Sequence, residues 1–292
     1  MNRKKRTAKA AAVFLVICVC IQIIGLSCFT PDGLESMLPA IIRAAGTDMI
    51  FGDNSYTDFY SLKEHCLDAD VIIVGVDFSV SESYSFLLDL IVSLKHEMRI
   101  DELYISHAIG MQPLFSAVVS AGSDAEMEEA KLQLVQSCSG DGIFCDFAQA
   151  LYELNKTYPP SRKLKFGALP GESGEDVISA CKAAEKYVSE NAGQVLLVVS
   201  TDLMENKEHY TEYVNSSDLE FRAVRCLYTA SADKDDGFRA LLVDTDDLSA
   251  YDSLYSAATA ISGKEMRGKS YSETHFTKFF VMMYNCSTED IH

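Results

Sequence analysis

Polar residues that could do chemistry recur just after the apolar runs of this chain. Asp77 follows VIIVGV at residues 71–76, His107 follows ELYIS at 102–106, and Asp202 lies two residues after VLLVVS at 195–200. Comparable places are held by Ser79, Ser106, Pro170, Glu172, Thr201, Asp244 and Asp246. A histidine among carboxylates can act in general acid/base catalysis or hold a divalent metal. Asp77, His107 and Asp202 are therefore the candidate catalytic residues. The sequence does not predict which metal such a site would hold, so the metal is unknown.

The same residue types have an ordinary structural explanation. Aspartate and serine after a strand cap the next helix by accepting hydrogen bonds from its free amides, as Asp77, Ser79, Ser81 and Asp202 could do. A histidine just past a strand is more often structural than catalytic. For any one of these residues, capping or packing is the favoured interpretation.

The elements that would position them alternate between strand and helix. The continuous apolar run at 71–76 is typical of a strand covered on both faces, and residues 81–97 place large apolar side chains at helical spacing. Further strands are predicted at 103–106, 164–168, 195–200, 238–243 and 276–284, with a helix at about 175–191. This alternation predicts an α/β fold with a mostly parallel central sheet flanked by helices. Ligands of such sheets bind at the carboxyl ends of the strands.

A long helical insertion is predicted after the second strand, at residues 111–156. Glu126, Glu128 and Glu129 are expected to face solvent, while an apolar stripe is formed by Phe144, Phe147, Leu151 and Leu154. No linker rich in Pro, Gly or Ser divides the body. We therefore expect a segment at 1–29 and a single α/β domain at 30–292.

The first 29 residues predict export or anchoring. Five basic residues between positions 3 and 9 precede an apolar stretch at 10–29, broken chiefly by Gln22 and Ser27. The stretch fits a transmembrane anchor, a cleaved signal peptide or a lipoprotein signal, the last because Gly25-Leu26-Ser27-Cys28 partly resembles a lipobox with Cys28 as the lipidated residue. All three place the domain on the extracytoplasmic face, and the anchored forms bind it to the cell membrane.

Charge and cysteine usage narrow the partners. The chain has 25 Lys+Arg against 43 Asp+Glu, a formal net charge of −18, and the five basic leader residues make the remainder still more acidic. Such a surface repels phosphate backbones, so nucleic-acid binding is excluded. The domain contains six cysteines without CxxC spacing, namely Cys66, Cys138, Cys145, Cys181, Cys226 and Cys286. Buried free thiols are favoured over disulfides. The familiar nucleophile, phosphate and zinc motifs are absent, and no cofactor is predicted.

The order of these elements resembles a known group of proteins. The strand VIIVG, a helix, the strand ELYIS, the insertion and FAQALYELNKTYPPSRKLKFGAL at 147–169 are similar to the erythromycin esterase-like group and its ChaN-like and Tiki-type relatives. The resemblance covers residues 71–171. It implies strand ends of the form Gly-Glu-x-x-His, Glu and Gly-x-Asp, with a further histidine later, which together activate water.

Most of that pattern is replaced in this chain. Gly75 matches, but Val76 stands at the glutamate and Ser79 at the histidine. Ser106 occupies the second glutamate position, and Gly167 is followed by Ala168 and Leu169 without the acid. The resemblance therefore implies a scaffold that has lost its mechanism.

Two hypotheses follow. The first is a membrane-anchored, extracytoplasmic, catalytically degenerate erythromycin esterase-like domain that acts by binding a small-molecule ligand or an unknown protein partner. The second is a hydrolase of a small ester or lactone, with a rebuilt site in which His107 is the base and Asp77 and Asp202 orient it or bind a metal. The two differ in whether these side chains converge.

Overall fold

A computed structural model describes most of the predicted domain. The described residues are 47–49, 59–97, 100–138, 142–167, 169, 177–191, 193–201, 204, 207–229, 239–244 and 277–284. The expected leader at 1–29, including Cys28, lies outside them. No helix among the described residues is long and apolar enough to cross a membrane.

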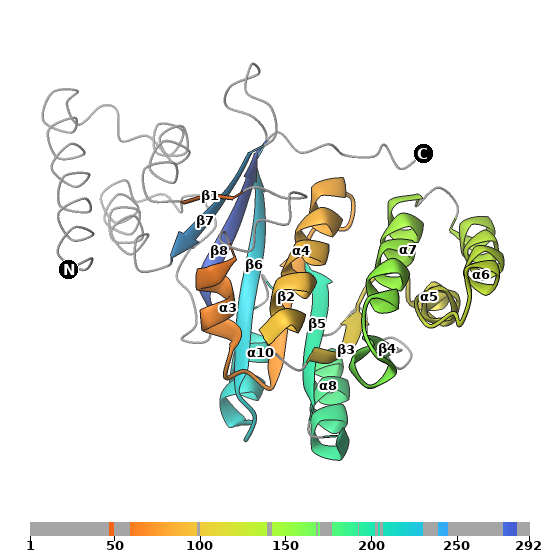
Figure 1. Cartoon of the computed structure of the whole chain (residues 1–292). Coiled ribbons are helices and arrows are strands. Elements are labelled where there is room, and N and C mark those ends of the chain that lie inside the picture. Colours follow the sequence, from red (N-terminus) through yellow and green to blue (C-terminus); the bar gives the residue numbers. More distant parts are fainter. Residues whose placement is uncertain are drawn as a thin grey trace, which may run out of the picture.

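The fold is α/β with a mostly parallel central sheet, as predicted (Figure 1). The strands are ordered β1-β7-β8-β6-β2-β5-β3-β4. The neighbours from β8 to β4 are parallel, whereas β7 is antiparallel to both β8 and β1. Their bounds are β1 Thr47–Met49, β2 Val71–Val76, β3 Ile100–Ile105, β4 Lys165–Gly167, β5 Gln194–Ser200, β6 Phe221–Thr229, β7 Arg239–Asp244 and β8 Thr277–Tyr284.

The first βα unit forms where the apolar pattern predicts it. All six residues of β2 are buried, because helices cover both faces of the sheet at this strand. Helix α4 (Ser81–Glu97) follows and buries one stripe, made of Phe86, Leu87, Leu90, Ile91 and Leu94. Burying each large side chain contributes about 1.5–3 kcal/mol, so this stripe fixes α4 on the sheet.

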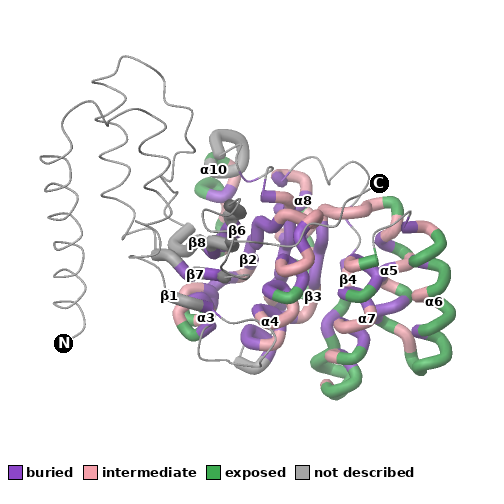
Figure 2. The backbone as a smooth tube through the Cα atoms, turned by 90° about the horizontal axis from the view of Figure 1, so that it is seen from above, coloured by how far each residue is buried: buried purple, intermediate pink, exposed green. Residues whose placement is uncertain are grey.

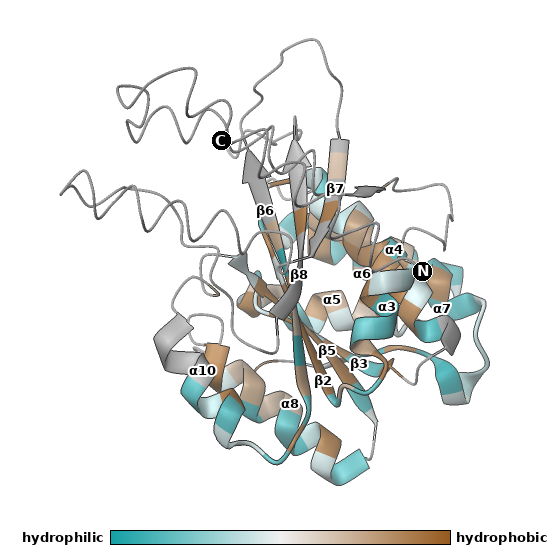
Figure 3. Cartoon of the chain, turned by 90° about the vertical axis from the view of Figure 1, so that its left-hand side faces the viewer, coloured by the Kyte–Doolittle hydropathy of each residue, from teal (hydrophilic) through white to brown (hydrophobic). Residues whose placement is uncertain are grey.

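The core is divided by the sheet into two layers. One layer packs α3 (Tyr60–Cys66), α4 and the helical insertion against the sheet. The other packs α8 (Val177–Asn191) and α10 (Lys207–Ser216) against the opposite face. Figure 3 shows α8 and α10 on one side of the strands and α3, α4 and α7 on the other.

The predicted insertion after β3 consists of three helices preceded by one helical turn. These are η2 (Ile109–Met111), α5 (Gln112–Val119), α6 (Asp124–Ser137) and α7 (Gly142–Lys156). The apolar stripe of α7 is buried except at Leu154, which is partly buried, and the glutamates of α6 are exposed, as expected. The helices lie at the β4 end of the sheet, with α6 outermost (Figure 2).

Among the described strands and α-helices, the sequence-based prediction lacked β1, α3 and β6. The last is the most important, because β6 pairs with β2 in the middle of the sheet. Five cysteines have described side chains, and all of them are buried thiols outside any disulfide, as favoured: Cys66, Cys138, Cys145, Cys181 and Cys226. Cys286 lies outside the described residues.

Candidate functional site

The connections between strands mark one place on the sheet edge where a ligand would bind. The chain leaves β2 toward α4 on one face, whereas it leaves the neighbouring β5 toward α10 on the other face. Ligands of open parallel sheets bind where neighbouring connections diverge in this way, outside the carboxyl ends of the strands. The ends of β2, β5 and β3 are therefore the candidate site.

Asp77, directly after β2, is engaged in a turn. Its Oδ1 accepts hydrogen bonds from the backbone N–H of Ser79 at 2.9 Å and from the Ser79 hydroxyl at 2.7 Å. The Asp77 carbonyl accepts a third bond, from the Ser83 hydroxyl at 2.7 Å. These contacts join the end of β2 to the first turn of α4, close to the capping role expected from the sequence.

His107, after β3, lies between two aromatic rings. Its imidazole stacks on the ring of Phe78, with centroids 4.6 Å apart, and meets the ring of Phe144 on α7 edge-on at 5.3 Å. The following residue, Ala108, has a left-handed backbone with φ 46°, which turns the chain sharply into η2. Because Phe78 is adjacent to Asp77, this stack brings the loops after β2 and β3 side by side.

Hydrogen bonds also join the ends of β3, β4 and β5. The Ser200 N–H of β5 donates to the Ser106 hydroxyl at 3.3 Å. The buried side-chain amide of Gln112 donates to the carbonyl of Ile105 and accepts from the N–H of Leu169, both at 2.7 Å. Gln112 thus ties the end of β3 to the segment after β4 from within the edge where a ligand is expected.

A buried arginine that sequence reasoning missed lies at the same edge. Arg225 on β6 is 4% exposed, and its Nε donates to the Thr201 hydroxyl at 3.4 Å. The same hydroxyl donates to the carbonyl of Cys226 at 3.0 Å. Because β2 lies between β5 and β6, these bonds of Thr201 link the end of β5 to β6 across the end of β2. The sequence did contain one signal for this residue, namely an arginine within a run of strand-forming residues.

The two glycines on which the resemblance rests have packing roles here. A Cβ at Gly75 would lie 2.2 Å from Met204 Sδ and 3.6 Å from Thr201 Cα, where the chain after β5 crosses β2. A Cβ at Gly167 would lie 2.4 Å from the ring of Tyr104 and 2.5 Å from Glu102 Oε1. Both positions exclude a side chain for reasons that do not involve catalysis.

Ionisable groups with shifted pKa values lie on and beside β3. Burial lowers the pKa of Lys95 to about 8, although the charge of Asp101 opposes this shift. The Lys95 ammonium donates to the carbonyl of Ile100 at 2.7 Å, at the amino end of the strand. Burial also raises the pKa of Glu102. Hydrogen bonds from Tyr104 and Tyr187 oppose this rise in part.

The predicted site residues thus have three different outcomes. Asp77 and His107 lie on neighbouring loops of one edge, whereas Asp202 lies outside the described residues, as do Pro170, Glu172 and Asp246. Asp244 is the last residue of β7, away from β2. Within the described ranges, no group of three His, Cys, Asp or Glu side chains could hold a metal ion.

Comparison with known proteins assigns no family. No family model matches the chain, and no curated protein matches it. Among solved structures, the type III effector HopBA1 is similar over 65% of this chain and 89% of its own, with 11% identity and a TM-score of 0.37. A Bacillus cereus protein is similar over 90% of this chain and 99% of its own, with 8% identity and a TM-score of 0.46.

Proposed function

We propose that this chain is a binding protein built on an erythromycin esterase-like scaffold that no longer performs ester hydrolysis. In this proposal the domain is held on the extracytoplasmic face of the cell membrane by the segment at 10–29 or by a lipid on Cys28. Its ligand is a small molecule or a protein partner that meets the carboxyl edge of β2, β5 and β3.

One observation carries the proposal: the side chains at that edge are engaged in holding the fold together. Asp77 Oδ1 accepts two hydrogen bonds from Ser79, His107 packs between phenyl rings, and Gln112 bonds to two backbone groups. A general base must instead reach the group that it serves, directly or through one water. The resemblance supports the same conclusion, since the expected acids are replaced by Val76 and Ser106.

Turnover and bound metal test this proposal together. The full-length chain would be assayed against a panel of esters and lactones, with metal content measured on the same sample and on His107→Ala. We expect no turnover above that of a boiled control in either protein, with circular dichroism showing both to be folded. Turnover that disappears in His107→Ala would overturn the proposal.

A rebuilt hydrolase is the second candidate, and one contact favours it. The stack of Phe78 on His107 places the imidazole on the loop next to Asp77, so the two groups named for acid/base work share one edge of the sheet. In this mechanism His107 would be the base, with Asp77 and Asp202 orienting it or binding a metal. Turnover that is lost in both Asp77→Asn and His107→Ala, with folding retained, would select this mechanism.

Anchoring needs a separate experiment. Cells expressing the chain or Cys28→Ser would be fractionated, and the mature N-terminus would be determined by mass spectrometry. A lipid-modified N-terminal Cys28 supports the lipoprotein form, while an intact leader in the membrane fraction supports the transmembrane form. Recovery of the chain in the soluble extracellular fraction would contradict both anchored forms.

A further inference from the structure

The outer face of α6 has the spacing of a helix-pairing surface. Ala125, Glu128, Leu132 and Val135 are all exposed and lie alternately three and four residues apart, which places them in one line along the helix. Leu132 is 61% exposed and Val135 is 48% exposed. We call these four positions the α6 seam. Three of them are apolar and face solvent.

This line is separate from the face by which α6 joins the domain. Met127 and Leu134 are buried against α5 and α7, on the opposite side of the helix. Figure 1 and Figure 2 both show α6 as the outermost helix of the insertion, with α5 and α7 between it and the sheet. An outermost helix needs one apolar face for its own packing, and α6 has two.

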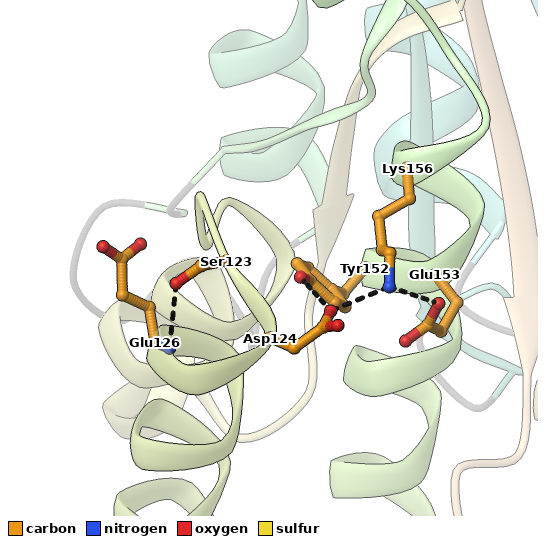
Figure 4. Close-up of polar contacts among 6 residues, drawn as sticks. All are labelled: Ser123, Asp124, Glu126, Tyr152, Glu153 and Lys156. Atoms are coloured by element: carbon orange, nitrogen blue, oxygen red, sulfur yellow. Dashed lines mark hydrogen bonds and ion pairs between the residues drawn. The ribbon is translucent and has the colours of Figure 1, made fainter.

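Polar contacts hold the helix in place without using the outer face. Ser123 Oγ accepts from the N–H of Glu126 at 3.3 Å, which caps the helix (Figure 4). Asp124 accepts from the Tyr152 hydroxyl and from the Lys156 ammonium of α7, each at 2.7 Å. A partner would thus meet a helix that is already formed, so binding would not have to order it.

The charges beside the line define the partner. Glu128 lies within the seam, Glu129 lies next to it, and neither makes an ion pair with any residue that the structure describes. We propose that this face docks a helix of another protein that presents apolar residues at heptad spacing and a Lys or Arg opposite Glu128 and Glu129. Such a helix would cover Leu132 and Val135 and neutralise both carboxylates.

A second copy of the chain fits this face poorly. In a parallel pairing of two α6 helices, Glu128 would lie opposite Glu128. In an antiparallel pairing centred on the seam, each Glu128 would lie against Leu132 of the other copy, which desolvates a carboxylate without a partner. The acidic net charge of −18 adds repulsion between copies. A basic helix avoids all three costs.

The experiment uses the full-length chain and a labelled peptide of two heptads, with leucine at the seam positions and lysine at the positions that face the carboxylates. Fluorescence anisotropy measures binding of the peptide, and salt at about 150 mM screens long-range electrostatic attraction. The variants are the double change Leu132→Gln with Val135→Gln, the charge reversal Glu128→Lys, and Gln133→Ala as an exposed control outside the seam. A scrambled peptide of the same composition controls for charge alone.

We expect the double variant to bind the peptide roughly tenfold or more weakly. Glu128→Lys should weaken this peptide and strengthen one in which glutamate replaces lysine, while Gln133→Ala binds like the unmodified chain. Equal binding of the ordered and scrambled peptides, or unchanged binding by the double variant with its circular dichroism intact, would overturn the proposal. A dimer of the unmodified chain in analytical ultracentrifugation that is absent in the double variant would also overturn the proposal, because the α6 seam would then bind a second copy of the chain.

Discussion

The two hydrogen bonds of Gln112 allow a sharp test of how the carboxyl edge is built. The change is Gln112→Met, which keeps the length of the side chain and removes both polar groups. Its bonds to Ile105 and Leu169 are each 2.7 Å long, and the side chain is 1% exposed. A net hydrogen bond contributes about 0.5–1.5 kcal/mol, and a buried group left unpaired costs about 1–3 kcal/mol. We expect a loss of about 2–4 kcal/mol in the free energy of unfolding.

Urea unfolding followed by circular dichroism measures this loss, since the chain has no tryptophan to report by fluorescence. With an m-value of about 3 kcal/mol/M, the midpoint should fall by about 1 M. Gln133→Met, at an exposed position on α6, is the matched control and should stay within about 0.5 kcal/mol of the unmodified chain. Equal midpoints for the two variants would refute the conclusion that Gln112 holds the strand ends together.

Three further predictions concern other parts of the fold. Gly75→Ala should destabilise the chain by about 1–3 kcal/mol, because the new Cβ would meet the buried Met204 side chain, and a urea midpoint equal to that of the unmodified chain would contradict this packing. The pKa of Lys95 is lowered to about 8 in the fold, so between about pH 8 and the ordinary lysine pKa of 10.5 the unfolded chain binds more protons than the folded chain. The contribution of Lys95 to the free energy of unfolding should therefore rise with pH over this range. Lys95→Met should remove that part of the pH dependence, and identical slopes for the two proteins would show the assignment to be wrong. Burial raises the pKa of Cys66 to about 12, so iodoacetamide at pH 8 should label this residue only at the rate of unfolding, as followed by peptide mass spectrometry, and rapid labelling of the native chain would show that the thiol is accessible.

The parts of the fold that local pattern determines were predictable from the sequence. Strand β2 and helix α4 have the predicted bounds to the residue, because an uninterrupted apolar run and a helical stripe are both local signals. The insertion after β3 was also predicted from its apolar stripe and exposed glutamates. The turn at Asp77 is close to the predicted cap, since an aspartate two residues before a serine can form it without tertiary help.

The parts that depend on distant residues were not predictable in this way. Strand β6 carries Arg222 and Arg225, and charges in a strand argue against burial on local grounds alone. The fold accepts Arg225 because Thr201, from the end of β5, supplies a hydroxyl beside its guanidinium. Likewise, the sequence presents His107 as a candidate base, and only the structure reveals the rings of Phe78 and Phe144 around it. Whether Asp202 joins that edge stays a prediction.

The position of β2 has a consequence for the order in which the molecule can assemble. Its two partners in the sheet, β5 and β6, begin at Gln194 and Phe221, whereas β3, which follows β2 along the chain, pairs with β5 instead. The middle of the sheet therefore cannot form until most of the chain has been synthesised, and such long-range pairing slows folding. Until then the apolar strand Val71–Val76 has no partner strand and is an aggregation hazard, so a chaperone that shields this segment would be expected to raise the yield of folded protein.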